Sequence, residues 1–203
     1  MKWNIILLLV MVCCSTAIAQ KHKPDHITAA VTTLHTAFPL GSFSKLFTAD
    51  FHPGFEIGMG FNWKTKTKYD WFQAFQLGYS YHRFVQHSIA LYSEFGYRYK
   101  FLKGFSAEAR TGLGYMHVIP TGKIFKLGED GNYKKKANLG RPQVMAAFSF
   151  RVNKAISKSG FGAFIQYQQR LQLPFIKSYV PLLPSNMVML GIKIPRSSMA
   201  RQK

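Results

Sequence analysis

Ser80, His82 and His87 lie close together in the sequence, and Glu94 follows a few residues later. A hydroxyl, an imidazole and a carboxylate are the groups of a hydrolase triad, in which the histidine accepts the serine proton and the acid orients the histidine. A chain with seven histidines and many serines also offers such combinations by chance. We therefore treat Ser80, His82, His87 and Glu94 as catalytic candidates, and we treat an enzyme as the alternative hypothesis.

A second set of residues is charged and recurs at alternate positions of apolar segments. The set comprises Glu94, Arg98, Glu108, Arg110, Arg151, Arg170 and Lys193. Alternate residues of a strand point to the same face of a sheet, so these side chains are expected to share the polar face. If that face is enclosed, the charges must pair, because an isolated buried charge costs several kcal/mol. The first interpretation is a structural salt-bridge network, and the alternative is a narrow conduction path or a buried site.

Metal and cofactor sites are not expected. Both cysteines, Cys13 and Cys14, fall within the N-terminal segment discussed below, and the histidines outside the Ser80 region are not at metal-ligand spacing. The acidic run at 129–132 lacks the distal glutamate of a calcium loop.

The chain is strongly basic, with a formal charge of +19. This charge permits nucleic acid, anionic lipid or an acidic macromolecule as a partner. The basic residues gather at the ends of the apolar segments rather than in one groove, which argues against nucleic acid. One cluster falls between two such segments and is a candidate for contact with lipid phosphates, such as those of lipopolysaccharide. Its members are Lys123, Lys126, Lys134, Lys135, Lys136 and Arg141. Plain solvation of the cluster is the alternative.

The first residues predict a secretory signal. Lys2 precedes an apolar run over 5–12, which is too short for a transmembrane helix, and Ala17 and Ala19 form an A-x-A cleavage site. We predict a cleaved signal over 1–19, one domain over 20–195 and a basic C-terminal tail over 196–203. A lipoprotein anchored through Cys13 or Cys14 is the alternative at this end.

Alternation with period two organises the rest of the chain and predicts strands of about 10 residues. Seven strands are expected over 55–63, 71–82, 88–99, 105–118, 143–153, 160–171 and 186–194. A closed barrel favours an even number, so 26–38 is expected to be the eighth strand, with an amphipathic helix as its alternative.

The polar faces are rich in glycine and the apolar faces carry aromatic residues near the strand ends, which favours a membrane barrel over a soluble β-sandwich. Counted from the first strand, the odd connections (39–54, 83–87, 119–142 and 172–185) are mostly long and the even connections are short. We therefore expect an all-β, eight-stranded antiparallel transmembrane β-barrel with short periplasmic turns and longer outer loops.

This strand rhythm, the signal and the connection lengths resemble the small eight-stranded outer-membrane β-barrel proteins of diderm bacteria. The resemblance covers roughly 26–194 and is one of architecture. It implies localisation in the outer membrane and contact with outer-membrane lipid. Some members of this group are lipid A deacylases or palmitoyltransferases, but their motif of a histidine followed two residues later by serine and then asparagine is absent.

The first functional hypothesis is a structural or interaction protein with a charge-filled lumen. The alternatives are an outer-leaflet hydrolase or acyltransferase and a narrow channel for small solutes. The apolar stretches 39–54 and 172–185 are candidates for contact with a protein partner, or they pack over the barrel mouth.

Overall fold

The computed structural model describes residues 23–36, 50–102, 104–122, 124–127, 131–136, 139–157, 160–174 and 182–196. The signal over 1–19 and the tail beyond Arg196 lie outside these residues and remain predictions. Positions 39–49 and 175–181 of the apolar stretches 39–54 and 172–185 also lie outside them. No helix in the described part of the chain has the length and hydropathy to cross a membrane.

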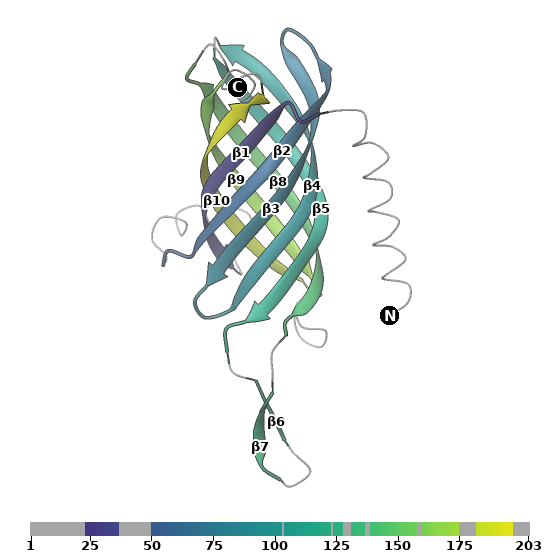
Figure 1. Ribbon diagram of the computed structural model, residues 1–203, viewed down its shortest axis with the longest axis vertical. Coiled ribbons are helices and arrows are strands. Elements are labelled where there is room, and N and C mark those ends of the chain that lie inside the picture. Colours follow the sequence, from purple (N-terminus) through teal and green to yellow (C-terminus); the bar gives the residue numbers. More distant parts are fainter. Residues whose placement is uncertain are drawn as a thin grey trace.

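Eight long strands form one closed antiparallel barrel (Figure 1). They are β1 (His26–Thr36), β2 (Pro53–Thr65), β3 (Tyr69–His82), β4 (Gln86–Leu102), β5 (Phe105–Pro120), β8 (Arg141–Ala155), β9 (Gly162–Leu173) and β10 (Leu183–Pro195). Neighbours follow the order β1-β10-β9-β8-β5-β4-β3-β2. The predicted fold class is confirmed, and the segment 26–38 is a strand rather than a helix over most of its length.

The barrel closes through its first and last strands. β1 pairs with β2 on one side and with β10 on the other, where the register runs from His26 opposite Pro195 to Thr36 opposite Ser185. Closure leaves no unpaired strand edge, which is the condition for a sheet to stand in a bilayer.

The two ends of the barrel differ in their connections. At one end, here called the turn end, the strands are joined by 66–68, 103–104 and 156–161, and Gly104 adopts a φ of 84° in its turn. At the other, the loop end, the connections are 37–52, 83–85, 121–140 and 174–182. The connection 121–140 contains a hairpin of β6 (Ile124–Leu127) and β7 (Tyr133–Lys136), which projects from the loop end (Figure 1). The alternation in the sequence does not predict this hairpin.

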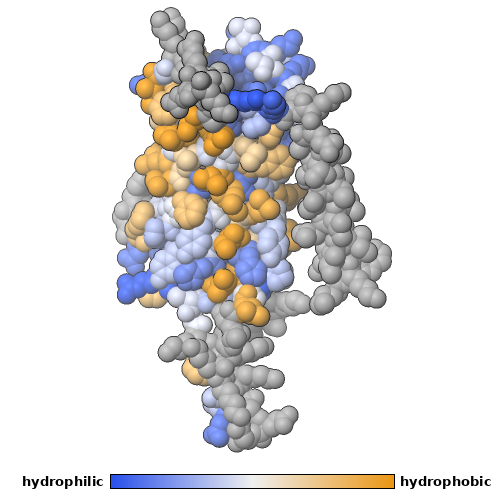
Figure 2. Space-filling view, in the orientation of Figure 1, coloured by the Kyte–Doolittle hydropathy of each residue, from blue (hydrophilic) through white to orange (hydrophobic). Residues whose placement is uncertain are grey.

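Polarity is inverted relative to a soluble β-protein. The outward face is apolar: Leu91 and Leu190 are each 57% exposed, whereas Glu94 and Arg110 on the inward face are at most 1% exposed. Hydrophobic residues spread over the barrel wall, and strongly hydrophilic residues gather toward its two ends (Figure 2). A soluble sandwich would bury its apolar face, so this distribution fits a wall in contact with lipid.

The interior, or lumen, is filled in two different ways. In the half nearer the turn end it contains most of the charged side chains, and Glu56 and Arg170 extend this set to the level of Tyr92. In the half nearer the loop end it contains two buried apolar clusters, one of Ala90, Tyr92, Met116, Val118, Met145 and Ala147, the other of Leu34, Met187 and Met189. We call these clusters the apolar layer. The sequence suggested a lumen of glycine and charge, and the apolar layer differs from that expectation because an interior this narrow must be closely packed with side chains along its whole length.

Candidate functional site

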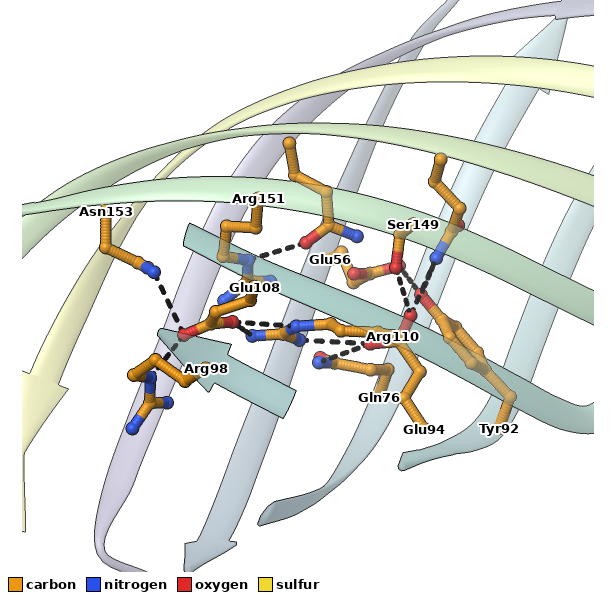
Figure 3. A network of polar contacts seen from close by, with 12 residues as sticks. Glu56, Gln76, Tyr92, Glu94, Arg98, Glu108, Arg110, Ser149, Arg151 and Asn153 are labelled. Carbon is orange, nitrogen blue, oxygen red and sulfur yellow. Dashed lines mark hydrogen bonds and ion pairs between the residues drawn. The ribbon is translucent and has the colours of Figure 1, made fainter. Parts of the chain in front are cut away.

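Arg110 on β5 lies at the centre of the buried charges. Its Nη1 donates to Glu94 Oε2 at 3.0 Å, and its Nε donates to Glu108 Oε2 at 2.8 Å (Figure 3). Arg110 Nη2 also pairs with the same Glu108 oxygen. All three side chains are fully buried. One guanidinium therefore bridges two carboxylates on adjacent strands, with the planar fork geometry that arginine provides.

Glu108 carries the network toward the turn end. Its Oε1 accepts hydrogen bonds from Arg98 Nε at 2.6 Å and from Asn153 Nδ2 at 2.9 Å. Arg98 Nη1 lies 3.2 Å from Asp70 Oδ2, and Lys100 Nζ lies 2.7 Å from Asp70 Oδ1. Lys100 is partly exposed, so the chain of ion pairs runs from the middle of the lumen to its rim.

Glu94 and Glu56 carry the network toward the loop end. Glu94 Oε1 accepts from Ser149 Oγ at 2.8 Å and from Gln168 Nε2 at 3.1 Å. Glu56 Oε2 accepts from Tyr92 at 2.6 Å and from Arg170 Nη2 at 2.8 Å. Tyr92 therefore belongs to both the charge network and the apolar layer, where it joins the two.

An aromatic ring supports the two central arginines. The ring of Phe72 is fully buried, and the guanidinium carbons of Arg98 and Arg110 lie 4.7 Å and 4.9 Å from its centroid. Phe72 is opposite Gly96 in the register, and a Cβ at Gly96 would collide with its ring. The glycine thus provides the space for a ring that contacts both cations.

Arg151 and Lys193 differ from the other charged candidates because they contact no carboxylate among the described residues. Arg151 donates from Nε to Gln166 Oε1 at 2.6 Å, and its guanidinium carbon lies 3.7 Å from the Phe164 ring centroid. Lys193 lies on the inward face of β10, opposite Thr28 of β1. Direct ion pairs therefore join five of the seven sequence candidates, together with Glu56, Asp70 and Lys100.

The four catalytic candidates occupy separate positions. Ser80 Oγ lies 2.9 Å from Ser88 Oγ, and His82 Nε2 lies 3.1 Å from Thr36 Oγ1. His87 is on the outward face, where its Nδ1 lies 2.8 Å from the Tyr79 hydroxyl. Glu94 is held in the charge network. The contacts within the described residues do not connect these four into a Ser–His–acid triad.

Three histidines meet at the loop end of the barrel, although they are far apart in sequence. The rings of His52 and His82 stack with centroids 3.7 Å apart, and His35 meets His52 edge-on at 5.8 Å. The arrangement does not amount to a metal site, since no group of three His, Cys, Asp or Glu side chains in the described part of the chain is placed to hold an ion.

The outward face at the loop end carries a groove of about 410 Å³. It is lined by Pro53, Gly54, Phe55, Tyr79, Tyr81 and His87. The Tyr81 and His87 rings lie 4.8 Å apart and belong to residues opposite each other in the β3–β4 register.

The candidates for lipid-phosphate contact are only partly described. Lys123 lies outside the described residues. Lys126, Lys134, Lys135 and Lys136 belong to the β6–β7 hairpin, and Arg141 begins β8 opposite Val118. All of the described members belong to the loop end.

Sequence reasoning missed several members of the charge network. The charged set predicted from the sequence does not include Glu56, Asp70, Tyr92, Gln166 or Gln168. Alternation was the available signal, because each shares the inward parity of its strand. The pairings across the lumen depend on the stagger of the strands, which alternation does not determine.

A closed eight-stranded antiparallel barrel with a polar lumen and an apolar wall defines the class of transmembrane β-barrels. No family model matches the sequence, and no curated protein matches it.

Among solved structures, the chain is similar to the outer-membrane enzyme PagL, with 15% identity, a TM-score of 0.47, and 84% of this chain and 99% of that chain covered. It is similar to Neisserial surface protein A, with 9% identity, a TM-score of 0.48, and 84% and 96% covered. It is also similar to the attachment invasion locus protein Ail of Yersinia pestis, with 11% identity, a TM-score of 0.41, and 83% and 95% covered. The closed eight-stranded antiparallel barrel of the chain itself has the architecture on which the resemblance stated above is based.

Proposed function

We propose that this chain is an outer-membrane protein with a structural or interaction role, whose barrel is a plugged scaffold and whose loop end makes the functional contacts. The observation that carries the proposal is the inverted polarity, with buried ion pairs such as Arg110–Glu94 inside and residues such as Leu91 exposed outside. Paired charges in the lumen fill the space that a solute would need.

The difference between the two ends supports the orientation. Small outer-membrane barrels have short periplasmic turns and longer outer loops, so the loop end, with the β6–β7 hairpin, faces outward in this proposal. The partner is then outer-leaflet lipid or a protein that approaches from outside.

Cell fractionation with gel migration before and after heating tests the proposal. We expect the protein in the outer-membrane fraction, with a mobility shift on boiling and protease cleavage confined to the loop end in intact cells. A soluble protein without a mobility shift would contradict the proposal. Planar-bilayer recording is expected to show no solute-dependent conductance, and a steady conductance would favour the narrow channel instead.

A further inference from the structure

The groove on the outward face of β2, β3 and β4 contains one histidine among apolar and aromatic side chains. Tyr79 engages Nδ1 of His87, and Tyr81 lies against the His87 ring. When the Tyr79 hydroxyl donates to Nδ1, the ring hydrogen lies on Nε2. His87 then offers one N–H donor at a wall that otherwise presents apolar surface.

A second histidine on the outward face of the barrel differs from His87 in its hydrogen bonds. His117 on β5 has the same tyrosine arrangement, with the Tyr115 hydroxyl 3.0 Å from its Nδ1. Its Nε2, however, lies 2.9 Å from the Leu139 carbonyl oxygen and is satisfied within the protein. For His87 the only hydrogen bond to a described residue is the one at Nδ1, so Nε2 is available for a ligand.

The turn beside the groove supplies a cation. Tyr81 and His87 face each other two pairs before the β3–β4 connection, which consists of Arg83, Phe84 and Val85. Arg83 is exposed, and its guanidinium carbon lies 5.3 Å from the centroid of the Phe84 ring, which is itself 71% exposed. Because this connection is the shortest at the loop end, it holds an arginine and an exposed aromatic ring close to the end of the apolar wall. Aromatic rings prefer that level of a bilayer.

The chemistry of these groups selects a ligand. The groove lining and the turn contain Arg83 and His87 as donors and no acidic residue. A phosphate accepts charge-assisted hydrogen bonds from a guanidinium and an imidazole N–H, while Phe55 and Tyr79 provide an apolar surface for an acyl chain. We propose that this groove binds lipid A, with a phosphate between Arg83 and His87 and an acyl chain along Phe55. The assignment to lipid A rests on the proposed function, which places the loop end in the outer leaflet.

Native mass spectrometry of the detergent-extracted mature protein tests this site. The probes are bis-phosphorylated lipid A and the same lipid A after removal of its phosphates. We expect the phosphorylated form to be retained about tenfold better, the scale of one charge-assisted hydrogen bond. Arg83→Gln and His87→Phe are each expected to reduce retention of the phosphorylated form to the level of the dephosphorylated form.

His117→Phe is the matched control, since it removes a tyrosine-bonded histidine from the same wall without touching the groove. It is expected to leave retention unchanged, and each variant must show the heat-dependent mobility shift of the folded barrel. Equal retention of the two lipids, or an equal loss in His117→Phe, would overturn the site. If the protein fractionates to the outer membrane but does not distinguish the lipids, this site fails and the proposed function stands; a soluble protein contradicts both.

Discussion

The two halves of the lumen are filled by different interactions. Near the turn end, Arg98, Arg110, Glu94 and Glu108 meet in fixed ion pairs. Near the loop end, buried apolar side chains such as Met145 pack together beside neutral hydrogen-bonded pairs such as Gln86–Gln172. An ion pair in a dry interior depends on every member, because losing one leaves its partner charged and alone. An apolar cluster depends on volume, and flexible methionine side chains can adjust to it. The comparison predicts that the charged half tolerates substitution least.

Replacing the central arginine is expected to give the largest effect. Arg110→Met leaves Glu94 and Glu108 without their shared cation, and we expect a loss of about 3–5 kcal/mol in the free energy of unfolding. Urea unfolding of the protein in lipid vesicles measures it. The triple variant Glu94→Gln, Glu108→Gln, Arg110→Met is expected to recover much of the loss, and a single variant as stable as the wild type would show that the network is not stabilising.

Truncating a side chain of the apolar layer is expected to lower the free energy of unfolding somewhat less than Arg110→Met does. Met145 is fully buried, and Met145→Ala is expected to cost about 2–4 kcal/mol through lost contacts and the cavity left behind. Met145→Leu, which nearly conserves volume, is expected to cost less than about 1.5 kcal/mol in the same unfolding experiment. If the two substitutions cost the same, the loop-end half depends on more than volume.

The third prediction concerns the packing of the Phe72 ring against Gly96 and the two arginines. Gly96→Ala places a Cβ against the ring and is expected to destabilise the protein by about 1–3 kcal/mol. Gly122→Ala is the control, because nothing lies within 4 Å of a Cβ there. Near-ultraviolet circular dichroism and urea unfolding report the change, and equal effects at the two glycines would argue against tight packing at Phe72.

Substitution at the exposed rim of the charge network is expected to change the free energy of unfolding least. Lys100 is partly exposed and Asp70 keeps its bond to Arg98, so Lys100→Met is expected to change stability by less than about 1 kcal/mol. Repeating the unfolding measurement at high salt is expected to reduce even this difference. A loss of stability comparable to that of Arg110→Met would mean that the contribution of these ion pairs to stability does not depend on how deeply they are buried.

The sequence predicts the strands better than the contacts between them. Alternation locates seven of the eight barrel strands, and the even strand count of a closed barrel adds β1. Alternation also puts Glu94, Arg98, Glu108 and Arg110 on one face, because inward and outward positions follow period two. It does not predict that Arg151 faces Phe164 instead of a carboxylate. Partners across the lumen are set by strand stagger, which one strand's pattern does not contain.

The same limit explains the histidines and the hairpin. His35 and His82 lie at the loop ends of β1 and β3, and His52 directly precedes β2. The three meet because these strands are neighbours in the barrel. The β6–β7 hairpin consists of two strands of four residues each, too short for alternation to separate from a loop. Nearness in sequence to Ser80 makes His87 a catalytic candidate. In the register His87 is opposite Tyr81 rather than Ser80, so it lies on the outward face of the wall.

The pairing of β1 with β10 determines when the barrel can close. Residues from opposite ends of the chain, such as His26 and Pro195, must meet before the sheet has no open edge. Until the last strand arrives, β1 and β9 each present a row of unpaired amides, which a hydrocarbon environment penalises heavily. The barrel can therefore close only after β10 is available, and the pairing of β1 with β10 is its seam.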